Sequence, residues 1–144
     1  MLYPGSSRVA RRFEIAHRTF AAGCPETLAG YTVTPYEVVH PAGAPSYAVR
    51  VQAGERTFAY SGDTAWTEEL ISAAMDCDIF ACECSSYATV VPYHLSWTEI
   101  EPQLQRLGGA RVMLTHMGQE MLARRHEAVH PKVIFAEDGL VLDV

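Results

Sequence analysis

The sequence contains no hydrophobic run long enough to cross a membrane, and its beginning lacks the apolar segment and small-residue cleavage site of a secretory signal. Positive charge is also scarce, with 17 acidic against 11 basic residues and Lys132 as the single lysine. Nucleic acids attract clustered positive charge, so a general nucleic-acid surface is not expected. We therefore expect a cytoplasmic protein with no membrane partner, although an arginine contact to a small anionic substrate stays open.

Cysteines at the spacing of a structural zinc site are missing as well. Cys82 and Cys84 flank Glu83, but no second cysteine pair accompanies them, and such a site needs four ligands. Together with Cys77 they lie inside apolar runs, and no export signal suggests an oxidising compartment. Buried free thiols are the interpretation that we favour over disulfides or metal ligands.

What the chain does contain is an ordinary globular composition. It has 144 residues, of which 49% are hydrophobic and 19% charged. This is enough to bury a core of useful size. No internal repeat, low-complexity tract or long linker divides it, so we expect residues 1–144 to form a single domain or part of one.

Hydrophobic periodicity predicts strands first and then alternating helices and strands. Antiparallel strands are expected at residues 12–19, 31–39, 47–52 and 57–60, and later strands at 78–84, 111–115, 132–136 and 140–144. Helices are expected after a cap at Thr67, from a cap near residues 96–101 to Gly108 and Gly109, and at residues 121–127. Pro102 favours Thr98 over Ser96 as the second cap. The order indicates an α/β (or α+β) sheet with helices on an outer face.

Residues that bind metals or move protons end several of these strands. They are His40, Asp63, Glu83 and His116, with His94 in the segment after Glu83. Strand ends are held by a stiff scaffold and reach an open edge, where sites are commonly assembled. Two imidazoles and a carboxylate are a ligand set that zinc takes, and a carboxylate can bridge two ions.

Each of these residues also has a purely structural interpretation. Asp63 can cap the following helix, His40 and His116 can be hydrogen-bonded strand ends, and a buried Glu83 can bond backbone amides alone. If Glu83 instead contacts His94, the carboxylate would orient the imidazole as a general acid for a leaving oxygen.

Taken in order, HPAGAPSYAVRV, YSGDT, CECSSY, YHLS and LTHMG resemble motifs of the metallo-β-lactamase superfamily, especially its ribonuclease Z-like branch, from about His40 onward. The resemblance implies that His40 binds one metal ion, Asp63 bridges two and His116 binds the second. It implies that Glu83 and His94 handle the proton. The implied fold is the C-terminal half of a four-layer αββα sandwich, a mostly antiparallel mixed sheet with helices on one face.

Two departures from the family pattern limit what the chain is expected to do alone. No His-x-His-x-Asp-His motif precedes His40, so fewer protein ligands remain for two zinc ions than catalytic sites use for one. The isolated chain should therefore bind zinc weakly or partially and be inactive. Only residues 41–62 separate His40 from Asp63, which leaves no room for the arm that clamps transfer RNA in bacterial ribonuclease Z enzymes.

The resemblance thus predicts a zinc-dependent hydrolase of a small ester or phosphodiester, with a site that is incomplete in this chain. The alternative is a catalytically inactive remnant or interaction module. In that alternative an exposed sheet face would pair with a second copy of the chain or with a separate N-terminal half.

Overall fold

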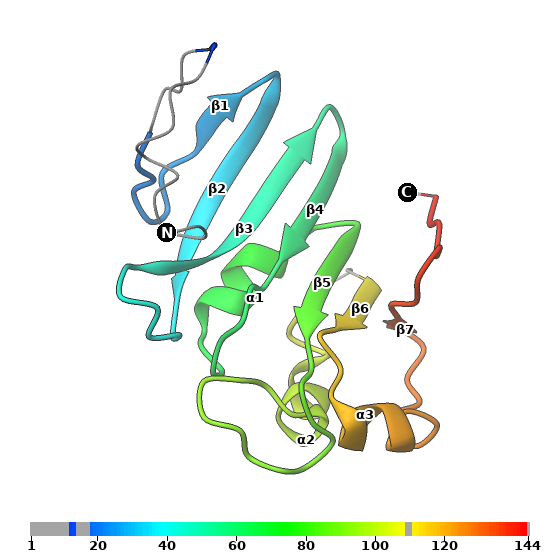
Figure 1. Ribbon diagram of the computed structural model, residues 1–144. Coiled ribbons are helices and arrows are strands. Elements are labelled where there is room, and N and C mark those ends of the chain that lie inside the picture. The colour runs from blue at the N-terminus through cyan, green and yellow to red at the C-terminus, as the bar shows by residue number, and fades with distance from the viewer. Residues whose placement is uncertain (1–11, 14–17, 109–110, 144) are drawn as a thin grey trace.

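The computed structural model describes residues 12–13, 18–108 and 111–143, and its seven strands form one sheet in chain order (Figure 1). The strands are β1 (Glu26–Leu28), β2 (Tyr31–Val38), β3 (Ser46–Ala53), β4 (Arg56–Tyr60), β5 (Ile79–Glu83), β6 (Arg111–Thr115) and β7 (Val133–Phe135). The helices are α1 (Glu69–Ala74), α2 (Trp97–Ile100) with the 3-10 turn η2 (Glu101–Gln103), and α3 (Gln119–Arg124). The chain therefore has the α/β architecture that the sequence predicts.

Strand direction changes within the sheet at β4. The pairs from β1 to β4 are antiparallel, and the pairs from β4 to β7 are parallel. Parallel neighbours require crossover connections, which here carry α1, α2 and α3. As a result β4, β5 and β6 all end at one edge of the sheet, and β2, two antiparallel pairings away from β4, ends there too.

One face of the sheet carries the hydrophobic core. Inward residues in register on neighbouring strands, such as Ala59 with Phe80 and Cys82 with Leu114, are fully buried. The helices add further buried side chains to the same cluster, namely Leu70, Ala73, Trp97, Ile100 and Met121. Burying such side chains contributes about 1.5–3 kcal/mol each for the larger ones. All three helices therefore cover the same face.

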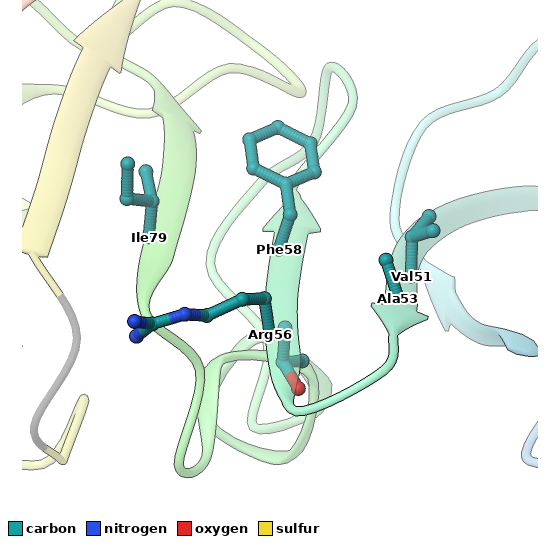
Figure 2. Close-up of a pocket in the computed structure, with 6 residues that line it drawn as sticks. Val51, Ala53, Arg56, Phe58 and Ile79 are labelled. Carbon is teal, nitrogen blue, oxygen red and sulfur yellow. The ribbon is translucent and has the colours of Figure 1, made fainter. Parts of the chain in front are cut away.

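The opposite face of the sheet is open in the described part of the chain. Alternate residues of β4 point to it, and Phe58 and Tyr60 are 41% and 40% exposed. A shallow apolar cavity of about 260 Å³ lies on this face. Figure 2 shows Val51, Phe58 and Ile79, from three neighbouring strands, around it.

Most predicted strands are confirmed, with ends shifted by a residue or two. The short β1 was missed because Glu26–Leu28 offers too few residues for an alternating pattern. The predicted strand at residues 140–144 is wrong, since residues 140–143 have no regular structure and β7 pairs in parallel with β6 instead. Of the predicted strand at residues 12–19, residues 14–17 lie outside the described residues, and 12, 13, 18 and 19 belong to no strand.

The helices are shorter than predicted, and their caps differ. In α2 the cap is Ser96, whose side chain and Glu99 form a capping box, so the preference for Thr98 is wrong. The helix then tightens into η2, where Pro102 takes an early position that needs no backbone N–H. Before α1 the cap position is Glu68, which makes no side-chain cap, while Thr67 Oγ1 accepts the Glu69 N–H at 3.5 Å.

The thiols and the membrane expectation can be checked on the described residues. Cys77, Cys82 and Cys84 are buried and free, as predicted, whereas Cys24 is free and exposed. Burial raises the pKa of Cys77 to about 11 and that of Cys84 to about 12, which makes both unreactive at neutral pH. No helix in the described ranges has the length and apolar character of a membrane span.

Candidate metal centre

The site lies at the sheet edge where β2, β4, β5 and β6 end. His40 follows β2 by two residues, Asp63 follows β4, Glu83 is the last residue of β5 and His116 follows β6 directly. His94 arrives from the segment between β5 and α2, which returns to this edge through the Ser85 N–H to Leu95 carbonyl hydrogen bond. Residues far apart in sequence thus become neighbours because their strands run the same way.

The side chains approach closely at this edge. His94 Nδ1 lies 3.1 Å from Glu83 Oε2, and His116 Nδ1 lies 3.3 Å from Asp63 Oδ1 and 3.5 Å from Glu83 Oε2. The His94 ring centroid is 5.6 Å from that of His40 and 5.2 Å from that of His116. The structure therefore brings all the predicted site residues together, with Glu83 Oε2 between two imidazoles.

Among the described residues, one group has the composition and spacing to hold a metal ion. Asp63, Glu83, His94 and His116 each offer a donor atom, and these atoms all lie within 4.8 Å of one another. Four nitrogen and oxygen donors are enough for one tetrahedral ion. His40 lies beside the group but is not a member of it, so the donors fit one ion and fall short of two.

Glu83 is completely buried, and hydrogen bonds hold both its backbone and its carboxylate in place. The Thr64 N–H donates to its Oε1, its own N–H donates to Ser61 Oγ at 2.9 Å, and Oε2 faces His94. The interpretation of Glu83 as bonded to backbone amides alone is therefore wrong. Thr64 Oγ1 also accepts the Val39 N–H at 3.0 Å, which ties the segment carrying His40 to the same framework.

Asp63 does not cap α1, because Glu68 occupies the cap position. The carboxylate of Asp63 instead faces His116. Gly62 precedes it with a positive φ of 62°, and a Cβ there would lie 3.2 Å from the Tyr47 carbonyl oxygen, so both conformation and space favour glycine. The glycine in front of Asp63 thus lets the chain turn sharply as β4 ends.

His116 has a strained backbone and a tightly packed neighbour. Its φ is +54°, a conformation that costs energy outside glycine and that persists where the surroundings impose it. Gly118 donates its N–H to the Ser85 carbonyl oxygen at 2.9 Å, and a Cβ on Gly118 would lie 2.5 Å from that oxygen. The loop after β6 is therefore fixed against the end of β5, which sets where the imidazole points.

The segment that carries His94 is held by residues that the sequence did not single out. Glu120 of α3 accepts the N–H groups of Ala88 at 3.4 Å and Thr89 at 3.2 Å, and Arg124 lies 3.6 Å from the centroid of the Tyr87 ring. Hydrogen bonding from the Thr89 side chain, and then from the backbone, lowers the pKa of Glu120. These contacts join residues about thirty positions apart, which no local pattern could have indicated.

Tyr60 is a further residue near the site that the sequence left unassigned. It ends β4 on the open face of the sheet and is 40% exposed. Burial, and then the negative charges of Asp63 and Glu83, raises its pKa above the ordinary value of 10.0. At neutral pH its phenol is therefore protonated and can donate a hydrogen bond.

Comparison with known proteins shows to which family the chain belongs. The family model described as the beta-lactamase superfamily domain matches residues 4–117, which is most of the chain. The chain belongs to the metallo-β-lactamase superfamily. The donor group at the sheet edge has the composition of a metal site.

Curated relatives in this superfamily are considerably longer. An uncharacterised protein of Mycobacterium tuberculosis is 33% identical over 109 residues, which cover 73% of this chain and 38% of the relative. YhfI of Bacillus subtilis, named a probable metallo-hydrolase, is 27% identical over 96 residues, covering 65% of this chain and 38% of the relative. The chain thus spans about two fifths of the length of the curated relatives it matches.

Solved structures show the superfamily fold. The crystal structure of the metallo-β-lactamase fold protein YhfI from Bacillus subtilis aligns with a TM-score of 0.75 at 24% identity, covering 93% of this chain and 58% of that one. The short form of human tRNase Z aligns with a TM-score of 0.60 at 19% identity, covering 82% of this chain and 44% of the other. At these identities the likeness establishes the fold alone.

Proposed function

We propose that this chain supplies the proton-handling residues and part of the metal ligands of a zinc-dependent hydrolase of ribonuclease Z-like type, acting on a small phosphodiester or ester. The observation that carries the proposal is the convergence of two carboxylates and three imidazoles at one sheet edge. In the proposed complete site, His40, Asp63 and His116 are ligands of two zinc ions, and the two oxygens of Asp63 suit a bridging role. Zinc supplies Lewis acidity to such a site when it is bound.

His94 is the proposed general acid. Its Nδ1 faces Glu83 Oε2 at 3.1 Å, which leaves Nε2 as the nitrogen that can give a proton to the leaving oxygen. Because Glu83 is buried and held by Thr64 and Ser61, it keeps the imidazole in one orientation without itself reaching solvent. We therefore assign Glu83 as the positioning residue and His94 as the proton donor.

The substrate proposal follows from what the edge can accommodate. Asp63 and His116 have side chains 38% and 48% exposed, so a small substrate has access from solvent. The net charge is −6, and only residues 41–62 separate His40 from Asp63. Both features favour a small phosphodiester or ester over transfer RNA.

A second candidate function is that of an inactive interaction module, and the open sheet face favours it. The apolar cavity around Val51, Phe58 and Ile79 lies on the face away from the helices (Figure 2). A partner sheet, from a second copy or from an N-terminal half-domain, would bury these side chains. The same covering is compatible with the hydrolase, whose second set of ligands would then come from the partner layer.

Completing the metal site distinguishes the hydrolase from the interaction module. The first step is to search the coding DNA upstream of Met1 for a reading frame that encodes His-x-His-x-Asp-His. The second is to express the protein with that upstream segment included, load it with zinc and assay it on bis(4-nitrophenyl) phosphate and 4-nitrophenyl acetate. We expect turnover that falls by roughly 100-fold or more in His94→Ala, the range lost with a general acid. The exposed His126→Ala is the matched control and should keep full activity.

Absence of such a frame would favour the interaction module. An extended, zinc-loaded protein that hydrolyses neither substrate would contradict the hydrolase proposal. Robust turnover by the 144-residue chain alone, with tightly bound zinc, would contradict the proposed incompleteness.

A further inference from the structure

We propose that residues 140–143, which follow β7, form an antiparallel β-strand pair with the same segment of a second copy of the chain. The inference rests on the second candidate function, in which a partner covers the open sheet face, and it names both the partner and the backbone contact. No residue of the candidate metal centre takes part in this contact.

The segment has the side-chain pattern of a strand but no strand partner. Leu140 and Leu142 line a cavity of about 400 Å³ on the open sheet face, and Val141 between them is 84% exposed. Side chains thus alternate between the sheet and solvent, as they do in a half-buried strand. Residues 140–143 nevertheless pair with no strand in the described part of the chain (Figure 1).

The backbone of this segment is free to pair. The Leu140 N–H donates to the Glu137 carbonyl oxygen at 3.0 Å, which closes the turn after β7. The N–H groups of residues 141–143 and the carbonyl groups of residues 140–142 form no hydrogen bond with another described residue. Hydrogen-bonding groups alternate in direction along an extended segment, so those of Val141 point away from the Leu140 bond. Such free groups are a template for pairing with another chain.

The segment is self-complementary in one register. When Val141 faces Val141 of the second copy, each Leu140 faces Leu142 of the other copy, and all four leucines lie on one side of the pair. Asp143 then faces Gly139, so no like charges are opposed although each copy has a net charge of −6. A shift by one residue would place Leu140 opposite Asp143 and turn the leucines of the two copies to opposite sides. Two strands alone are marginally stable, and the leucines add burial against the open sheet faces.

The test measures association of the whole 144-residue chain by sedimentation equilibrium over a range of concentrations. We expect a dimer, and Val141→Pro should raise its dissociation constant roughly tenfold or more, because the twofold symmetry removes the N–H bond twice. Val141→Thr is the matched control. It keeps the N–H and the β-branched shape, and it should dimerise as the unchanged chain does.

Cysteine cross-linking tests the register, and it replaces the first test if Val141→Pro fails to fold. The exposed Cys24 is first changed to serine so that it cannot cross-link. Residues that face each other and exchange hydrogen bonds have Cα atoms about 5.5 Å apart, a distance that a disulfide spans. Val141→Cys should therefore give a covalent dimer on mild oxidation, whereas Asp143→Cys, which faces Gly139, should stay largely monomeric.

Three outcomes overturn the inference, and all of them leave the hydrolase proposal in place. A chain that stays monomeric refutes it outright. If Phe58→Asp prevents association and Val141→Pro does not, the copies associate through side chains alone, and the inference fails while the second candidate function stands. If a protein extended upstream of Met1 is monomeric and protects the Val141 amide from hydrogen exchange, the partner of the strand is the N-terminal half and not a second copy.

Discussion

At the scale of single residues, the candidate metal centre depends on positions that contribute no ligand. Ser61 and Thr64 hold the buried Glu83, and Gly118 lets the loop carrying His116 lie directly on Ser85. Gly118 has a φ of −78°, so its backbone conformation is open to any residue. It is the lack of a Cβ, and not a left-handed turn, that makes glycine necessary here.

Gly118→Ala should therefore destabilise the chain by overpacking. The new Cβ would lie 2.5 Å from the Ser85 carbonyl oxygen, a backbone atom that can move only with the end of β5. We expect a loss of about 1–3 kcal/mol in the free energy of unfolding, measured by urea denaturation. Ala123→Ser, at an exposed position of α3, is the control and should change stability by less than about 0.5 kcal/mol. Equal stability of the two variants would show that Ser85 yields freely.

At the scale of elements, α3 stabilises the segment between β5 and α2 rather than the sheet alone. Glu120 and Arg124 stand one turn apart on α3, and each holds a different part of the segment that ends in His94. Arg124 also pairs with Glu127 at 2.7 Å, which fixes its guanidinium over Tyr87. The helix thereby links the position of His94 to that of His116, which lies just before it.

Glu120→Gln should lower thermal stability in a manner that depends on pH. Hydrogen bonds, first from the Thr89 side chain, lower the pKa of Glu120 below its ordinary value of 4.5. A lowered pKa in the folded state means that the charged group stabilises the fold above the ordinary pKa and loses this effect as pH falls through the lowered value. The melting temperature of the unchanged chain should therefore exceed that of the variant at pH 7, and the difference should shrink below about pH 4.5.

The measurement is a set of thermal melts across this range, with Glu101→Gln as the matched control on an exposed carboxylate. A difference that stays constant with pH would contradict the role assigned to the charge of Glu120.

At the scale of the whole molecule, the sheet is covered on one face and open on the other. The helices lie against one face of the sheet (Figure 1) and bury its inward residues. The outward row of β4 leaves Phe58 and Tyr60 substantially exposed. Apolar side chains also surround the neighbouring hollow between β4, β5 and the chain after β7. A sheet with one apolar face open favours association, because burial removes that surface from water.

The isolated chain should consequently self-associate through this face. Phe58→Asp should shift it toward monomer in sedimentation or light-scattering measurements, because a charged side chain at the centre of the face resists burial. Val90→Asp, at a residue 79% exposed in the segment before α2, is the control and should leave association unchanged. A wild-type chain that stays monomeric at high concentration would contradict the proposal that this face needs a partner.

Local structure could be predicted where the hydrophobic pattern of a single segment was sufficient. The alternation in β2, β3 and β4 and the apolar run of β6 placed those strands within a residue or two. The prediction failed where contacts with residues far along the chain determine the local structure. Residues 140–143 resemble a strand by composition but form no ladder, and β7 pairs in parallel with β6 instead. The choice of Ser96 as the cap likewise depends on the segment after β5, because the Trp97 N–H donates to the Ser86 carbonyl oxygen.

The sequence by itself determined that residues able to bind metals or move protons follow strands, because residue type and hydrophobic period are local properties. It could not determine how those side chains meet. Parallel pairing of β4, β5 and β6 places Glu83 beside Thr115, one residue before His116, and directs both ends to the same edge. Only that register, together with the return of His94, sets Glu83 Oε2 between two imidazoles. Such contacts join strands and a loop that are separate in sequence, so their geometry exists only in the folded chain.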